Sequence, residues 1–166
     1  MVHRRHDCPK RRAVTLQLVR DQAKRNLPLS FQEFAKEALR HPADDPPHED
    51  HALEERWGAM LNQPGFTCIV GFTGGHLVSS CCLAIIPNLT RGARPYALIE
   101  NVVTHRDFRR QGYAKALLSE ALSRAWSKEC YKAMLLSGSQ RSETHRFYES
   151  CGFRSEEKKG FVAHPG

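Results

Sequence analysis

The sequence has no apolar run that approaches the length of a membrane-spanning helix. Its basic start, MVHRRHDCPKRR, is followed by no apolar segment of the kind that a secretory signal requires. The six cysteines form no CxxC pair and no zinc-ligand spacing, and no internal repeat or low-complexity segment is present. These absences argue against a membrane protein and predict a cytoplasmic protein with reduced thiols and no bound metal.

Two familiar phosphate-binding patterns are also missing, since the chain contains neither a GxGxxG fingerprint nor the GKS or GKT of a Walker loop. The formal net charge of +7 nevertheless favours an anionic partner, which leaves open a nucleic acid, a phosphorylated cofactor or an acidic substrate. Nucleic-acid binding is the weakest of the three, because no interleaving of aromatic and basic residues accompanies the charge. We therefore expect no nucleic-acid partner.

Hydrophobic content of 40% and charged content of 26% are typical of a soluble globular protein. We expect one domain over residues 13–166 after a basic tail over residues 1–12. Periodicity and turn residues predict strands at 13–20, 66–73, 76–86, 93–105, 130–138 and 158–165. Helices are predicted at 30–41, at 52–61, from the stretch 108–118 with apolar positions that run from Ala114 to Trp126, and at 142–153 with its end at Cys151-Gly152. The predicted class is α/β (α+β), a mixed sheet with helices on its faces.

Gly112 stands at the start of a predicted helix, in the stretch FRRQGYAKALL. A helix N-terminus presents unpaired amides and partial positive charge, and a residue without Cβ lets a phosphate approach them. Arg109 and Arg110 add cationic donors. From this pattern alone, an anion site and a simple turn both remain open.

The wider context resembles a known family. ENVVTHRDFRRQGYAKALL resembles motif A of the GCN5-related N-acetyltransferases (GNAT superfamily), with the core Arg/Gln-x-x-Gly-x-Gly/Ala, and HRFYESCGF (145–153) resembles their Phe-Tyr-x-x-x-Gly-Phe motif. The two motifs stand in the family's order, and the resemblance covers residues 66–153. It implies a mostly antiparallel sheet of about six to seven strands with helices on both faces.

The resemblance implies acetyl-coenzyme A (acetyl-CoA) as the co-substrate. In the family, backbone groups of the central strand run beside the pantetheine, and here that strand carries Val102, Val103 and Thr104. The glycine-rich loop holds the pyrophosphate, and the matching residues are Arg109, Arg110, Gln111, Gly112, Tyr113, Ala114 and Lys115. Arg141 stands where the family often has an asparagine that contacts the coenzyme, and an arginine there could reach a phosphate.

Glu100 lies with Asn101 in an otherwise apolar strand, and a carboxylate there needs a task or a partner. It could accept the proton of an attacking ammonium group, as a glutamate on this strand does in many members of the resembling family, or pair with an arginine, or bind a substrate cation. Tyr148 matches the family's tyrosine that protonates the departing thiolate, or it simply packs beside Phe147.

Three further patterns carry less weight. His41, His48 and His51 lie in an acidic loop without a zinc spacing, and Cys130 or Cys151 with His145 could form a nucleophilic pair that direct transfer does not need. The segments ENVV and CYK also resemble glucosamine-phosphate acetyltransferases, but LLSGSQ replaces the aspartate expected after the fifth strand.

The sequence therefore predicts an acetyl-CoA-dependent N-acetyltransferase that acts by direct attack on a primary amine, with a small amine metabolite favoured over a protein amine. The alternative is a non-catalytic, regulatory CoA-binding module with the same fold. A homodimer is compatible with the resemblance, and no membrane partner is expected.

Overall fold

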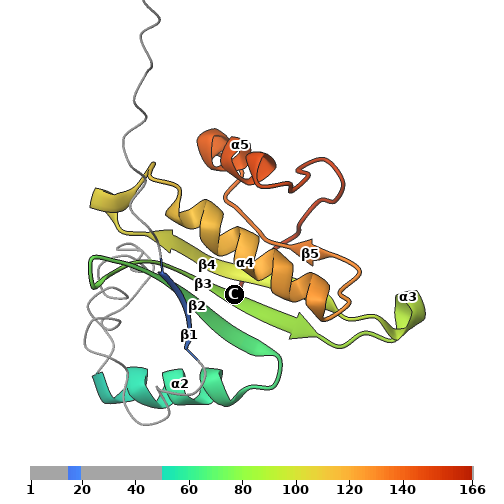
Figure 1. The fold of residues 1–166 in the computed structure, drawn as a ribbon. Helices are drawn as coiled ribbons and strands as arrows, with labels where there is room; N and C mark the ends of the chain where they lie inside the picture. Colours follow the sequence, from blue (N-terminus) through green and yellow to red (C-terminus); the bar gives the residue numbers. More distant parts are fainter. Residues whose placement is uncertain (1–14, 20–49, 166) are drawn as a thin grey trace, which may run out of the picture.

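The computed structural model describes residues 15–19 and 50–165, and Figure 1 shows how the elements are arranged. The tail at 1–12, the helix at 30–41 and most of the acidic loop lie outside the described residues. Five strands form one sheet in the order β1-β2-β3-β4-β5, in which only β4 and β5 pair in parallel. The strands are β1 (Thr15–Val19), β2 (Phe66–Thr73), β3 (His76–Ile86), β4 (Tyr96–Thr104) and β5 (Ala133–Met134).

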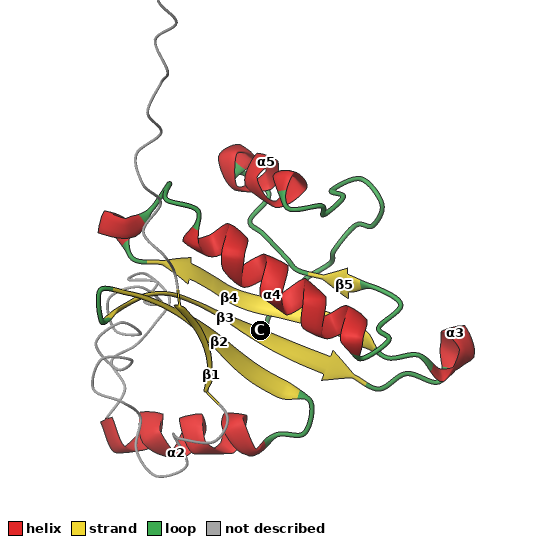
Figure 2. Cartoon of the chain, viewed as in Figure 1, coloured by secondary structure: helices red, strands yellow, loops and turns green. Residues whose placement is uncertain are grey.

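Along the chain, the helices come between and after these strands, and Figure 2 distinguishes the two kinds of element by colour. They are α2 (Asp50–Asn62), the short α3 (Thr90–Ala93), the 3-10 turn η2 (Arg106–Phe108), α4 (Tyr113–Ser127) and α5 (Ser142–Ser150). The hairpin of β2 and β3 turns at Gly74 and Gly75, whose φ angles of 55° and 80° are open to glycine at no steric cost. The bounds predicted for these two strands are confirmed.

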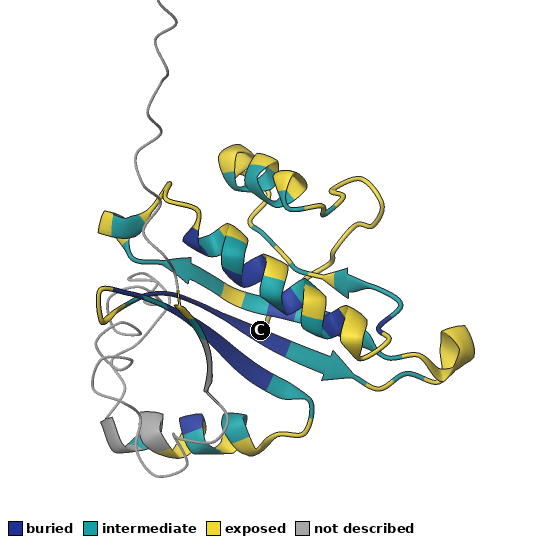
Figure 3. Ribbon diagram, in the orientation of Figure 1, coloured by how far each residue is buried: buried dark blue, intermediate teal, exposed yellow. Residues whose placement is uncertain are grey.

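Two hydrophobic clusters hold helices on the two faces of the sheet (Figure 3). The first packs Leu117, Leu118, Ala121 and Ala125 of α4 on the sheet, and the second includes Trp57 of α2. Cys81 lies in the first cluster and Cys82 in the second, as the alternation of a strand requires. The predicted mixed, mostly antiparallel sheet with helices on both faces is confirmed.

The second half of the chain corrects three expectations. The strand expected at 130–138 shrinks to Ala133–Met134. The last helix, by contrast, ends where it was expected to, with Ser150 as its last residue, Cys151 as its C-cap and Gly152 at φ 94°. Residues 158–165 form no strand, so the described sheet has five strands and not six or seven. Trp126, expected on the core face of α4, is 51% exposed.

The missing final strand has a physical reason, because a strand needs a neighbour that accepts its hydrogen bonds. β5 offers only two paired residues, and the side chains of Phe161 and Val162 are 88% and 70% exposed. Phe161 and Val162 are apolar, as a strand would need, but among the described residues no strand pairs with the tail.

Candidate active site

The sheet opens between β4 and β5. The parallel pairing covers only Ala97 with Ala133 and Leu98 with Met134, whereas β4 continues to Thr104. Within the described residues, the far half of β4 therefore has no β5 partner along that edge. The predicted strand-side residues Val102, Val103 and Thr104 all lie in this half.

A β-bulge on β4 lies at the start of this opening. Glu100 pairs with Cys82 and Val103 with Ser80, so two residues of β4 lie opposite Cys81 alone. Asn101, the first of the two, has φ 53°, and its side-chain amide donates to the Cys82 sulfur at 3.9 Å. The bulge thus places Glu100 and Asn101 together on the face of the sheet that carries Cys82, and returns Val102 to the α4 face, where it packs against the first cluster.

Glu100 is half-buried at this position, and burial raises the pKa of its carboxyl above the ordinary value. No arginine or lysine among the described residues forms an ion pair with it. Of the alternatives left open by the sequence, the arginine pair gains no support. A carboxylate with a raised pKa is suited to accepting a proton.

Tyr148 lies on α5 and packs against the first cluster, on the α4 face. Its ring centroid is 5.4 Å from that of Phe147 and 6.1 Å from that of Phe153. Burial raises the pKa of Tyr148, and the nearby carboxylate of Glu100 raises it further, while the charge of Arg141 lowers it. Tyr148 thus packs beside Phe147 and is also near enough to Glu100 for that carboxylate to raise its pKa.

The predicted phosphate loop is fixed by its own side chains. The Nε of Arg109 donates to the carbonyl of Thr104 at 3.2 Å, and the Nε2 of Gln111 donates to the carbonyl of Asp107, also at 3.2 Å. Tyr113 is buried, with its ring centroid 6.2 Å from that of Phe108. In this structure the side chains of these three residues brace the loop, and the exposed side chains of Arg110 and Lys115 remain beside its amides.

Gly112 caps the N-terminus of α4 in the left-handed region, at φ 91° and ψ 0°. A Cβ built on Gly112 would meet no atom within 4 Å, so no packing contact requires glycine there. The first amides of a helix, here those of Tyr113, Ala114 and Lys115, have no carbonyl partner within it, and Gly112 has no side chain to cap them. Backbone conformation and open space therefore both fit an anion at this point.

Arg110 precedes this glycine with a positive φ of 61° and an exposed side chain. Arg141, the residue before α5, also is exposed and lies close enough to Tyr148 to affect the pKa of that phenol. The structure thus places Arg141 near the expected acid.

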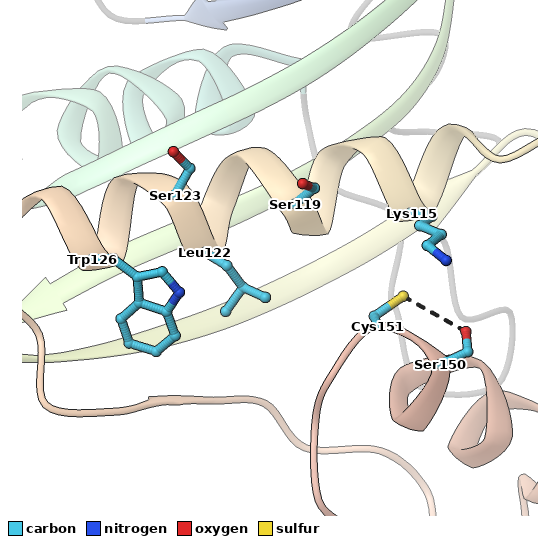
Figure 4. A pocket seen from close by; sticks show the side chains of 7 residues that line it. All are labelled: Lys115, Ser119, Leu122, Ser123, Trp126, Ser150 and Cys151. Atoms are coloured by element: carbon cyan, nitrogen blue, oxygen red, sulfur yellow. Dashed lines mark hydrogen bonds between the residues drawn. The ribbon is translucent and has the colours of Figure 1, made fainter.

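A groove of about 450 Å³ runs between α4 and the end of α5 (Figure 4). Its lining residues are Lys115, Ser119, Leu122, Ser123, Trp126, Ser150 and Cys151. Apart from Lys115, sequence reasoning did not find this feature, because Leu122 and Trp126 continue the apolar period of the helix. The four-residue spacing of Lys115, Ser119 and Ser123 is the signal that marks this side of α4 as polar and outward-facing.

The alternative interpretations, a nucleophilic pair and a metal site, gain no support from the residues that the structure describes. His145 places its Nε2 2.9 Å from the carbonyl oxygen of Gly138, and Cys130 is buried in the first cluster. The Cys151 sulfur lies 4.0 Å from the Oγ of Ser150, so among the described residues neither cysteine is hydrogen-bonded to His145. No three His, Cys, Asp or Glu side chains of residues 15–19 and 50–165 stand together as a metal site would need. No helix in these ranges is long and apolar enough to cross a membrane.

Comparison with known proteins relates this geometry to a family. The family model for the acetyltransferase (GNAT) family matches residues 30–153. Glucosamine 6-phosphate N-acetyltransferase of Trypanosoma brucei brucei is 40% identical over 85 residues, which are 51% of this chain and 56% of that protein. The chain thus spans little more than half the length of this curated relative.

Solved structures agree with the family match. A protein of Agrobacterium tumefaciens assigned as an acetyltransferase superposes with a TM-score of 0.71 at 43% identity, over 75% of this chain and 85% of its own. An acetyltransferase of Trypanosoma brucei superposes with a TM-score of 0.70 at 28% identity, over 92% of this chain and 100% of its own. With three quarters of the sequence inside the family match and the fold shared, the chain belongs to the acetyltransferase (GNAT) family.

Proposed function

We propose that this protein is an N-acetyltransferase that moves the acetyl group of acetyl-CoA to the primary amine of a small acceptor by direct attack, within a single domain over residues 13–166. The observation that carries the proposal is the coincidence of two features. The unpaired edge of β4 beyond Leu98 leads directly into a loop and helix start whose amides are free to bind an anion.

Donor binding follows from these two features. The open edge of β4 over Val102 to Thr104 offers backbone donors and acceptors to the amide groups of the pantetheine. The amides that follow Gly112 bind the pyrophosphate, because the helix terminus favours negative charge. Arg110 and Lys115, both exposed, supply cationic side chains near those phosphates.

Acid–base chemistry is assigned to Glu100 and Tyr148. Glu100 takes a proton from the acceptor ammonium, directly or through water, so that the nitrogen lone pair can attack the thioester carbonyl. Tyr148 is neutral at physiological pH, since its pKa is raised, and donates its phenolic proton toward the sulfur as the carbon–sulfur bond breaks. The loop and strand amides also hold the thioester in place during the attack.

A small amine is favoured as the acceptor, because the curated relative is named for glucosamine 6-phosphate. The sugar phosphate itself is one candidate among several, since LLSGSQ departs from the pattern expected after the fifth strand of such enzymes. The competing function is a CoA-binding module without catalysis. The presence of Glu100 and Tyr148 in electrostatic contact favours the enzyme.

A thiol-release assay with acetyl-CoA and a panel of amines tests this proposal. The panel contains glucosamine 6-phosphate, an aminoglycoside, a polyamine and a peptide with a free N-terminus. We expect CoA release that depends on one of the small amines, falls strongly in Glu100→Gln and leaves acetyl-CoA affinity unchanged in that variant. Tight coenzyme binding without release for any amine would establish the module instead, and faster release with the peptide would refute the small acceptor.

A further inference from the structure

Cys68 of β2 and Cys82 of β3 lie directly opposite each other in the antiparallel register. The backbone N–H of Ile85 donates to the carbonyl of Gly65 at 2.9 Å, so residues 65 and 85 form a hydrogen-bonded pair. Pair types alternate along an antiparallel ladder, which makes Cys68 and Cys82 a non-hydrogen-bonded pair, with Cα atoms about 4.5 Å apart. This spacing lies within the range of about 4.4 to 6.8 Å that a disulfide spans.

Both thiols lie on the same face of the sheet. They belong to the second cluster with Trp57 and Val70, where Cys68 is fully buried and Cys82 is 8% exposed. A hydrogen bond from the Cys68 thiol lowers the pKa of Cys82, and the side-chain amide of Asn101 also donates to the Cys82 sulfur. Cys82 is thus the more nucleophilic and the more accessible member of the pair.

We propose that Cys68 and Cys82 are a thiol modification site that hydrogen peroxide converts reversibly into a cross-strand disulfide. The Cys82 sulfur attacks one peroxide oxygen, the O–O bond breaks, and Cys82 sulfenic acid forms with release of water. The Cys68 sulfur then attacks the Cys82 sulfur, the S–O bond breaks, and a second water leaves. The two thiols lose two electrons in total, and the peroxide is reduced to two waters; a dithiol reductant reverses the change.

Competing pairings are blocked by the fold. Cys81 is next to Cys82 in sequence, but its side chain lies in the first cluster on the other face of the sheet. Cys130 also belongs to that cluster, and Cys151 lies at the end of α5. Among the described cysteines, only Cys68 and Cys82 stand in register on one face.

Oxidation would also reach the candidate active site. A Cys82 sulfur bonded to Cys68 can no longer lie where the Asn101 amide donates to it, and Asn101 is the bulge residue that follows Glu100. Reversible inhibition of acetyl transfer is therefore expected, and this consequence rests on the proposed function. The disulfide itself does not, so its detection is the primary test.

The test uses the full chain with Cys8→Ser and Cys151→Ser, treated with hydrogen peroxide, alkylated under denaturing conditions and digested with chymotrypsin. Phe72 and Leu77 provide cleavage sites between the two cysteines, so a linked pair of peptides reports the bond. We expect this link to form with peroxide, to disappear with dithiothreitol, to persist in Cys81→Ala and to be absent in Cys82→Ser. In Cys68→Ser, dimedone should label Cys82.

Three results would overturn the proposal. One is the absence of the link at a peroxide dose that fully oxidises Cys151 in a parallel sample of the protein that retains this cysteine. Another is a link that survives in a folded Cys82→Ser variant, which would mean that Cys81 is the partner. The third is conversion of Cys82 to sulfinic acid without any linked peptide. Because dimedone labelling of Cys68→Ser is independent of the link, the attack by Cys82 is tested even if one variant folds poorly.

Discussion

Gly112→Ala separates what the loop does for the fold from what it does for binding. At φ 91°, the position is in the left-handed region, where an L side chain costs about 1–2 kcal/mol. Alanine also reduces the entropy of the unfolded chain, which offsets about 0.4–1 kcal/mol of that cost. Since the added Cβ meets no atom within 4 Å, no steric term is added. The net loss of unfolding free energy is about 1 kcal/mol, or about 2–4 °C in Tm.

The expected loss of coenzyme affinity is larger. Relief of the backbone strain at residue 112 would turn the amides of Tyr113 to Lys115 away from the phosphates. One hydrogen bond to a charged group contributes about 1.5–3 kcal/mol, so its loss weakens binding by about 10- to 150-fold. Titration calorimetry with acetyl-CoA, together with thermal unfolding in its absence, measures both quantities.

Gly75→Ala is the matched control. Gly75 has φ 80° in the β2–β3 turn, and a Cβ there also meets nothing within 4 Å. The two variants should therefore lose similar stability, while only Gly112→Ala loses affinity. Wild-type affinity in a folded Gly112→Ala variant, or an equal loss of affinity in Gly75→Ala, would refute the assignment of the loop as the phosphate site.

Three further variants test the candidate site. Glu100→Gln should lower turnover by about 100-fold or more. Burial raises the pKa of Glu100, so the wild-type protein loses stability as pH rises through that pKa. Glutamine does not titrate, so the difference in Tm between Glu100→Gln and wild type should be more favourable to the variant at pH 7 than at pH 4. Tyr148→Phe should lower turnover without weakening acetyl-CoA binding in calorimetry. Arg109→Ala, which removes the hydrogen bond to Thr104, should weaken that binding by about tenfold.

Local signals predicted much of the fold. The Gly74-Gly75 pair fixed the ends of two strands, because two consecutive positive φ angles are needed there and few other residues accept them. The period of α4 identified four of its fully buried side chains, since the helix lies on the sheet with one face. Such features depend on neighbours in the sequence, and sequence reasoning is accurate for them.

Features that depend on a missing neighbour were not predictable. The apolar segments around β5 and at 158–165 have the composition of strands, but pairing requires a second strand that the pattern cannot guarantee. Trp126 is the corresponding case in a helix. It continues the apolar period of α4, but its side chain is 51% exposed, because burial depends on a packing partner that the period does not specify. The groove along α4 follows from this exposure, and in the sequence only the four-residue spacing of Lys115, Ser119 and Ser123 points to it.

The bulge on β4 changes which residues lie next to the candidate base. Without the extra residue, strict alternation would place Glu100 on the α2 face, Asn101 on the α4 face with Ala97 and Ile99, and Val102 away from that core. With it, Asn101 joins Glu100 on the face of Cys82, and Val102 packs against the first cluster. A bulge also increases strand twist, and pairing with β5 ends at Leu98, just before it. One inserted residue therefore sets Asn101 beside the carboxylate, returns Val102 to the core and helps to open the edge of β4 next to Glu100.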